Sequence, residues 1–487
     1  MGAQIKVSDS WWGDPYPAEG FFAGYTSGVN YGASHTGTDP DTYGEGDWFI
    51  WDNTYKNMEG APKLDINQDP DDTFVQEGRD YHFSEYPGYT PYPHPHPHRV
   101  EANDGCLPRD TARCMGGDVY WFDSCDMPGE KKDVCEVNET CLEAECIKEP
   151  EPTNIVHVEN PGEGNDILMN IKEAFNAASD GDTILLPAGT FTINDGDSGE
   201  MNNSIYLYPE GAPFSGSIPD NVHFKGRGTG PNGTKLVKNV ELGYENDDHA
   251  IKISGKYADK TVDDVEVSDI LFEGIADLRQ TEEETGSTYD WLKGPFGFYN
   301  TDVYLHDCEF RKFSNYIIAV DYVPGRGIWS DTVIANNVFE DNYVIENDGT
   351  TEGGSCISVN RHTKTWEDEQ AGSEHFVFVE DNYFSAQSSP VVGGLGCLYV
   401  FRHNYVDRSY KGVLNMHSSY GGKVSSRFIE AYENTFLMAS QDDPIYEPHH
   451  TGIVGSHGGE GIAWNNTIVG FDGGVRLPIY PGYWGEP

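Results

Sequence analysis

A short recurring sequence motif limits what this chain can fold into. Each copy begins with a largely alternating stretch, reaches one shared position, and has an apolar residue two positions later. The copies are WFIWDNTYKN (48–57), VEVSDILFEG (265–274), VYLHDCEFRK (303–312), TVIANNVFED (332–341), FVFVEDNYFS (376–385), LYVFRHNYVD (398–407), FIEAYENTFL (428–437) and GIAWNNTIVG (461–470). The shared position holds Asn53, Ile270, Cys308, Asn337, Asn382, Asn404, Asn434 and Asn466. From Ile270 on, the copies lie 22 to 45 residues apart, which predicts an irregular array of stacked coils with loop insertions.

The repeated asparagine has a physical reason in such a stack. Period-2 alternation sends residues such as Tyr399 and Phe401 to one face of a strand. The asparagine then turns the chain, and its amide can bond the coils above and below, as in known Asn ladders. Each coil covers the open edge of its neighbour, so only the two ends of the stack need caps. A β-sandwich is the alternative, but it does not require the same residue at the same turn of successive strands.

A helix and a strand precede the coils. Residues 166–179, DILMNIKEAFNAAS, place Ile167, Ile171, Phe175 and Ala178 along one helical face, and DGDTILLPAGTFTI follows as a turn and a strand. Over about residues 155–487 the chain resembles the pectate-lyase-like right-handed parallel β-helix superfamily, many of whose members begin with this helix and a similar strand. The resemblance implies an all-β, right-handed parallel β-helix with a short N-terminal capping helix.

Residues 74–98, FVQEGRDYHFSEYPGYTPYPHPHPH, resemble the closing stretch that follows the last coil in a group of bacterial β-helix proteins. Here that tail comes first, so we predict a permuted order: a terminal coil and tail (1–99), a cysteine-rich module (100–150) and the β-helix (151–487). The tail would close the C-terminal end of its own chain, which we favour. Two alternatives are closure of a neighbouring chain in a head-to-tail filament and a sequence window cut across two tandem domains.

The cysteine-rich module holds six of the nine cysteines, an even number in a short acidic stretch, which favours a small disulfide knot over a zinc site. These are Cys106, Cys114, Cys125, Cys135, Cys141 and Cys146. Zinc is disfavoured because paired Cys-x-x-Cys ligands are missing. Cys308, Cys356 and Cys397 lie within the coils, where we expect buried core thiols, with one disulfide among them as an alternative.

The net charge of −50 opposes binding to nucleic acid and to anionic membranes. A polyuronate would need a bridging divalent cation, and the acidic surface suits saline, halophilic surroundings. No apolar run of about 20 residues exists, so we expect no membrane span. Disulfides imply an extracellular or cell-surface location, and because the first residues lack a secretory leader we expect a fragment or a processed end.

The two residues before each shared position should point away from the core and form a surface column, with coils about 4.8 Å apart. At its centre lie the candidate catalytic residues Glu380, Asp381, Arg402, His403 and Glu433. Such carboxylates with a basic neighbour suit acid–base or metal-assisted chemistry. Trp464 and Trp51 flank them and would stack on sugar rings. The alternative is a solvated charge ladder with no function beyond stability.

Further candidates come from small-residue stretches and from the superfamily resemblance. His417 is a catalytic candidate, and Arg427 and His457 are substrate-binding candidates. The motifs of polygalacturonase-type hydrolases do not occur here in the required order.

Two segments offer metal ligands. DINQDPDD (65–72) places Asp65, Asn67 and Asp69 at calcium-loop spacing, but it lacks the glycine and glutamate of an EF-hand, so a plain acidic loop is the alternative. Calcium is the one cofactor that the sequence suggests. The stretch PHPHPHR (93–99) could bind a transition metal, but alternating proline favours a stiff extended segment.

These observations favour a secreted β-helix protein that binds or cleaves polysaccharide, or a cell-surface glycan, in an outward groove. If it is an enzyme, it is a polysaccharide lyase or a glycoside hydrolase. The alternative is a non-catalytic structural, adhesive or fibre-forming protein that self-associates through residues 1–99, because fold alone does not decide function.

Overall fold

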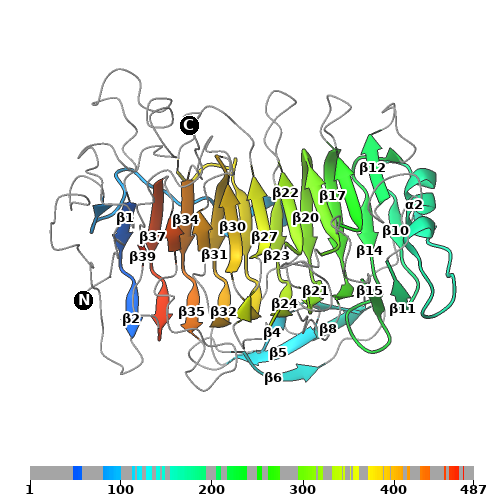
Figure 1. The fold of residues 1–487 in the computed structure, drawn as a ribbon, viewed down its shortest axis with the longest axis horizontal. Coiled ribbons are helices and arrows are strands. Elements are labelled where there is room, and N and C mark those ends of the chain that lie inside the picture. Colours follow the sequence, from blue (N-terminus) through cyan, green and yellow to red (C-terminus); the bar gives the residue numbers. More distant parts are fainter. Residues whose placement is uncertain are drawn as a thin grey trace, which may run out of the picture.

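The computed structural model describes residues 48–56, 81–99, 112–115, 118–122, 128–133, 139–142, 145–148, 154–193, 205–209, 217–238, 249–254, 262–274, 294–313, 316–321, 332–342, 344–345, 351–352, 355–360, 371–387, 389–394, 396–409, 414–416, 428–438, 454–456, 460–470 and 475–476. Most of these residues lie in three long sheets whose strands all pair in parallel. The parallel β-helix implied by the sequence resemblance is therefore the architecture of the chain (Figure 1).

The first sheet carries most of the candidate site residues that the structure describes. In spatial order it contains β3 (Tyr81–His82), β1 (Trp48–Trp51), β37 (Glu460–Trp464), β34 (Phe428–Tyr432), β31 (Leu398–Arg402), β28 (Val377–Glu380), β23 (Val333–Ala335), β20 (Thr301–His306), β17 (Val262–Ser268), β14 (His223–Lys225), β10 (Thr183–Leu185) and β9 (Ile155–His157).

The second and third sheets complete the coils. The second contains β11 (Gly189–Thr192), β15 (Thr234–Val237), β18 (Ile270–Glu273), β21 (Glu309–Arg311), β24 (Val338–Asn342), β29 (Tyr383–Gln387), β32 (Tyr405–Ser409), β35 (Thr435–Met438), β38 (Thr467–Val469) and β2 (Thr54–Lys56). The third contains β13 (Ser217–Ile218), β12 (Ile205–Pro209), β16 (Ile251–Ser254), β19 (Phe296–Tyr299), β22 (Ile318–Asp321), β27 (Ser355–Asn360), β30 (Ser389–Gly394), β33 (Leu414–Met416), β36 (Val454–Ser456) and β39 (Val475–Arg476).

The predicted asparagine ladder is present at the turn between the first and second sheets. Each asparagine donates hydrogen bonds to the asparagine of the next coil in the stack: the Asn404 backbone N–H and Nδ2 donate to Asn434 Oδ1 at 2.9 and 3.2 Å. The same pattern runs from Asn337 to Asn53. These side chains satisfy buried backbone groups at every turn, which explains why the sequence repeats this residue.

Inside the coils, aromatic and aliphatic residues from all three sheets form one continuous core. The apolar residues two positions after the asparagine stack on one another, as Phe310 and Phe339 do with ring centroids 4.9 Å apart. Cys308, Cys356 and Cys397 are buried free thiols, so the prediction of core thiols is confirmed and a disulfide among them is excluded.

The predicted helix is present as α2 (Leu168–Ala177), at one end of the stack (Figure 1). Ile167, Ile171 and Phe175 are buried, as the periodicity predicted, and α2 packs against β9, β12 and β13. Its role as a cap stays a prediction.

The position of residues 48–56 explains why the two ends of the chain carry the same sequence motif. Strand β1 pairs in parallel with β37, and β2 pairs with β38, so this segment forms the coil beyond the C-terminal coil of the same chain. Asn53 continues the ladder, because Asn466 Nδ2 donates to its Oδ1 at 2.8 Å. This is the favoured intramolecular arrangement, and association between chains stays a prediction.

The cysteine-rich stretch contains an antiparallel sheet of β4 (Ala112–Met115), β5 (Asp118–Phe122) and β6 (Pro128–Asp133), and a hairpin of β7 (Glu139–Leu142) and β8 (Glu145–Lys148). Cys141 and Cys146 occupy facing positions of that hairpin. Cys106, Cys125 and Cys135 lie outside the described residues, and only the backbone is described at Cys114, Cys141 and Cys146, so the disulfide knot stays a prediction.

Two short pieces remain: the hairpin of β25 (Val344–Ile345) and β26 (Thr351–Glu352), and the 3-10 turn η2 (Pro97–Arg99). None of the helices in the described part of the chain has the length and apolar character that crossing a membrane requires.

Candidate functional site

The predicted column lies on the outer side of the turn between the first and second sheets. The residue immediately before each ladder position has a positive φ, for example 55° at Asp381, 54° at His403 and 57° at Glu433. Left-handed backbone is uncommon outside glycine but easiest for Asp and Asn, which occupy most of these positions. The turn therefore aims this side chain outward, while the residue before it ends a strand of the first sheet on the outer face.

The tail, residues 81–99, lies along the outer face of the first sheet and covers the middle of this column. It packs on an apolar cluster of that outer face, which includes Phe376, Phe378, Val400 and Phe428. Tyr92 and Phe378 have ring centroids 5.1 Å apart, for example. Because of this cover, Glu380 and Arg402 are both 0 % exposed. The prediction that these two residues lie on the surface was wrong, because the tail packs over this part of the outer face.

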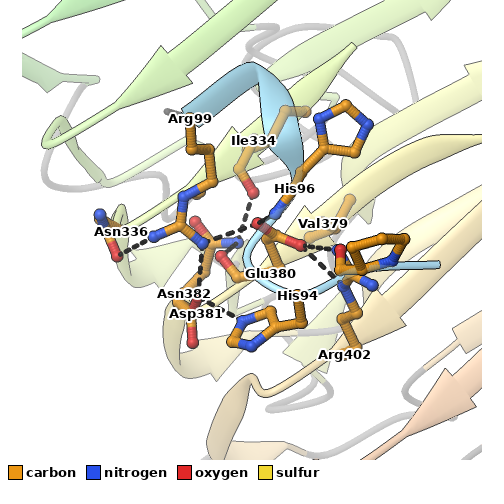
Figure 2. Close-up of polar contacts among 12 residues, drawn as sticks. His94, His96, Arg99, Ile334, Asn336, Val379, Glu380, Asp381, Asn382 and Arg402 are labelled. Atoms are coloured by element: carbon orange, nitrogen blue, oxygen red, sulfur yellow. Dashed lines mark hydrogen bonds and ion pairs between the residues drawn. The ribbon is translucent and has the colours of Figure 1, made fainter. Parts of the chain in front are cut away.

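An ion-pair network fastens the tail to the column (Figure 2). Arg99 Nη1 lies 2.6 Å from both Glu380 Oε1 and Asp381 Oδ2. Arg402 Nη2 lies 2.6 Å from Glu380 Oε2, and Arg402 also donates to the carbonyl oxygens of Tyr92 and Pro93 at 2.6 and 2.8 Å. Two guanidinium groups thus share one buried carboxylate, and they satisfy the backbone of the tail as well.

The electrostatics follow from these contacts. Burial works to raise the pKa values of Glu380 and Asp381, but the adjacent Arg99 outweighs it, and the pKa of each carboxyl is lowered. Both carboxylates therefore stay ionised at neutral pH. A carboxylate held between two arginines is a poor proton donor or acceptor, so this geometry favours a structural role for Glu380.

His403 and Glu433, which were also predicted to be catalytic, lie at the edge of the network. His94 stacks on His403 with ring centroids 3.6 Å apart, and its Nε2 lies 2.9 Å from Asp381 Oδ2. His403 Nε2 lies 2.8 Å from Glu433 Oε2, and this hydrogen bond lowers the pKa of Glu433. The proline- and histidine-rich stretch, for which we predicted a stiff linker, is thus part of the interface between tail and sheet.

Trp51 and Trp464 lie in neighbouring coils and stack on each other. The two rings lie parallel with centroids 5.7 Å apart, and Trp464 also stacks on Tyr432 at 5.0 Å. Tyr89 and Trp51 pack edge to face with centroids 6.1 Å apart, and sugar stacking by the two tryptophans stays a prediction.

Sequence reasoning missed one buried acid beneath the tail. Glu430 is fully buried, and Tyr89 Oη and the Gly372 N–H each donate to it at 2.6 Å. Burial raises its pKa to about 7, although these hydrogen bonds oppose the rise. Gly372 has φ +78°, and a Cβ there would lie 2.1 Å from the Thr90 carbonyl oxygen, so only glycine fits beneath the tail. A lone acid in the apolar strand FIEAY was the available signal.

Several predicted site residues lie outside the described part of the chain. These are His417, Arg427 and His457, together with the candidate calcium ligands Asp65, Asn67 and Asp69. Their roles stay predictions.

A second cluster lies further along the same face, beyond the end of the tail. His223 on β14, Glu266 on β17 and His306 on β20 belong to three adjacent parallel strands. His306 Nε2 lies 2.9 Å from Glu266 Oε1, and His223 Nε2 lies 3.4 Å from the same oxygen. The side chains are 21 %, 39 % and 11 % exposed for His223, Glu266 and His306. We call these three residues the His–Glu–His cluster.

Polar neighbours surround this cluster. His306 Nδ1 lies 2.7 Å from Asp307 Oδ2, and His223 Nε2 lies 2.8 Å from Ser268 Oγ. Ser268 in turn donates to Asp269 Oδ2 at 2.7 Å, and Lys225 Nζ lies 3.4 Å from the same oxygen. Both histidines of the cluster are therefore held in place by a further polar group.

The pKa values in the cluster diverge. Burial lowers the pKa of His223 to about 4, whereas burial is outweighed at His306, where Tyr304, Asp307 and Glu266 hold the pKa well above its usual value. The adjacent His223 and His306 outweigh burial at Glu266 and lower its pKa to about 2. The run VEVSD and the pair His306–Asp307 belong to the column predicted from the sequence. His223 could not be assigned to it, because its coil has Gly226 where the repeated motif has its outward residue.

Comparisons with known proteins give fold-level likenesses only. No protein-family model matches the chain, and no curated protein matches its sequence. Among solved structures, an alginate lyase from Paenibacillus sp. str. FPU-7 is 13 % identical with a TM-score of 0.36, covering 67 % of this chain and 98 % of that one. A Family 28 exopolygalacturonase from Yersinia enterocolitica is 12 % identical with a TM-score of 0.32, covering 76 % and 83 %. The A-module of a mannuronan C-5 epimerase from Azotobacter vinelandii is 13 % identical with a TM-score of 0.30, covering 65 % and 97 %. Likenesses of this size say nothing about the chemistry of a site.

Proposed function

We propose that this is an extracellular protein that binds polysaccharide along the outer face of the first sheet and cleaves it at the His–Glu–His cluster. The observation that carries the proposal is the convergence of two imidazoles and a carboxylate on a partly exposed part of that face. These are the groups that acid–base or metal-assisted cleavage of a glycosidic bond requires.

The shape of the face supports a linear polymer as ligand. Parallel coils present the same face at regular intervals of about 4.8 Å, so an extended chain can contact several coils at once. The end of the tail borders the site, because Arg99 Nη2 lies 3.4 Å from Asn336 Oδ1, in the coil next to that of His306. The site predicted from the sequence lies beneath that tail, so we place the cleavage site further along the same outer face.

The test is a screen of neutral and acidic polysaccharides for binding and for release of reducing or unsaturated ends. The wild-type chain is compared with Glu266→Gln, and with Glu159→Gln, which changes an exposed glutamate on the connection that follows β9. We expect Glu266→Gln to lower turnover at least a hundredfold and Glu159→Gln to match the wild type. Full activity of Glu266→Gln, or no ligand for the wild type, would overturn the proposal.

A structural protein is the second candidate. It is favoured by the network of Arg99, Glu380 and Arg402, which uses the richest set of charges on the face to hold the tail in place. Light scattering of the purified chain distinguishes the two candidates. Assemblies that grow with time and are abolished by deletion of residues 1–99 support the structural candidate, and a monomer of about 54 kDa opposes it.

A further inference from the structure

We propose that the His–Glu–His cluster binds one divalent transition-metal ion, with Zn²⁺ as the first candidate, and that this ion holds oxygen atoms of the polysaccharide. The metal site stands on geometry alone. Its role toward polysaccharide rests on the function proposed above.

The ligand atoms converge from three strands. His223 Nε2, Glu266 Oε1 and His306 Nε2 all lie within 4.8 Å of one another. Glu266 Oε1 lies 2.9 Å from His306 Nε2 and 3.4 Å from His223 Nε2, and bonds of about 2.0–2.2 Å from one central ion can reach atoms at these separations. The register of the parallel strands creates the arrangement: His223 pairs with Glu266, while His306 lies two residues beyond the partner of Glu266 on β20, and therefore on the same face.

The groups around His306 match those around metal-bound histidines. Such a histidine usually gives its other ring N–H to a carboxylate, which fixes the ring and its tautomer. His306 Nδ1 lies 2.7 Å from Asp307 Oδ2, so Nε2 is left to face the centre of the cluster. Asp307 is the outward residue of its coil, with φ 51°, so the turn itself supplies this partner.

The donor set indicates the class of ion. Two imidazoles and one carboxylate suit zinc and other first-row transition metals, whereas calcium and magnesium prefer oxygen ligands. His94, Glu380 and Asp381 also converge within 4.8 Å. There, however, the Arg99 guanidinium already lies 2.6 Å from both carboxylates and supplies the positive charge, so we infer no ion at that position.

Three protein ligands leave at least one coordination position open, as in catalytic zinc sites. On a chain with a net charge of −50, a bound cation would give an acidic or hydroxyl-rich polysaccharide a positive contact. The expected ligand class is therefore a polysaccharide whose carboxylate or adjacent hydroxyl oxygens can complete the coordination of the ion.

The test measures Zn²⁺ alone, by titration calorimetry and by metal content after dialysis, on the full chain first stripped with a chelator. His94, His96, His98 and the thiols can also bind Zn²⁺, so the readout is the difference in bound Zn²⁺ between the wild type and each variant. We expect His306→Ala and Glu266→Gln each to lose one equivalent of Zn²⁺, and Asp307→Asn to weaken that site at least tenfold. His157→Ala removes an exposed histidine from the same sheet and should bind as the wild type does.

Equal stoichiometry and affinity in the wild type, His306→Ala and Glu266→Gln would overturn the metal site. Circular dichroism and melting of each variant show whether it folds; should His306→Ala not fold, Glu266→Gln, at the more exposed position, carries the test. Zinc bound at the cluster without any polysaccharide ligand would leave the metal site standing and sink the proposed function. Polysaccharide turnover that survives metal stripping but is lost in Glu266→Gln would sink the role of the ion alone.

Discussion

Two parts of one column, on one face of one sheet, have different environments in this molecule. Beneath the tail, Glu380 and Arg402 are fully buried and paired. Beyond the end of the tail, Glu266 and His223 remain 39 % and 21 % exposed. The residue types are similar in both parts, so what separates a structural network from a candidate site is whether another segment of the chain covers them.

The strands themselves carry this difference. The covered strands read as near-continuous apolar runs, FVFVE and LYVFR, because both their faces are buried: Val379 faces the core and Phe378 faces the tail. The open strand reads VEVSD, with polar residues on its outer face. An apolar outer face predicts a cover, and an alternating one predicts access to solvent.

The largest expected effect comes from breaking the buried network. Glu380→Gln leaves the guanidinium groups of Arg99 and Arg402 buried without their shared carboxylate, and we expect it to lower the free energy of unfolding by about 3–5 kcal/mol. Glu433→Gln, in the half-exposed pair with His403, should change it by less than about 1 kcal/mol. Denaturant titrations of the two variants measure both values, and equal effects would show that the cover does not seal the network.

The asparagine ladder gives the next effect. Asn404 Nδ2 donates to the carbonyl oxygens of Val379 and Arg402 at 2.8 and 2.9 Å, and Asn404 Oδ1 accepts from the Asn382 N–H at 3.0 Å. Asn404→Ala leaves these buried groups without hydrogen-bond partners, so we expect the free energy of unfolding to fall by about 3 kcal/mol. Asn53, at the end of the ladder, is half-buried, and Asn53→Ala should lose about 1 kcal/mol. Thermal melting of the two variants compares their losses of stability, and a larger loss for Asn53→Ala than for Asn404→Ala would contradict the ladder.

Beneath the tail, Glu430 should make stability depend on pH. Its pKa is raised from 4.5 to about 7, chiefly by burial, so the folded protein holds a proton that the unfolded chain releases. Its stabilising contribution is therefore full below pH 4.5 and is lost as pH rises through 7, by about 2–3 kcal/mol. The carboxyls of Glu380 and Asp381, with lowered pKa values, act in the opposite sense at lower pH.

Melting between pH 5 and 8 isolates the Glu430 contribution. We expect the wild type to lose stability across this range relative to Glu430→Gln, which cannot titrate. Parallel curves for the two proteins would mean that Glu430 is ionised beneath the tail throughout.

The smallest expected effect on stability lies in the open part of the column. His223→Ala removes a partly exposed side chain whose hydrogen bonds water can replace, so we expect a change of less than about 1 kcal/mol. A loss as large as that of Glu380→Gln would show that the His–Glu–His cluster is structural, and it would remove the contrast between the two parts of the column.

The sequence by itself determined the coils. Period-2 alternation, the repeated asparagine and the apolar residue two positions later predicted the stack, the ladder and the place of residues 48–57 in it, because each is a local requirement repeated in every coil. Only the tertiary structure decided which segment covers the apolar part of the outer face and where that cover ends. That depends on where residues 81–99 dock, through contacts such as Arg99 with Glu380, which are 281 residues apart in the chain. No local pattern encodes such a contact, and the proximity of His223 to His306 likewise follows from strand register across two coils.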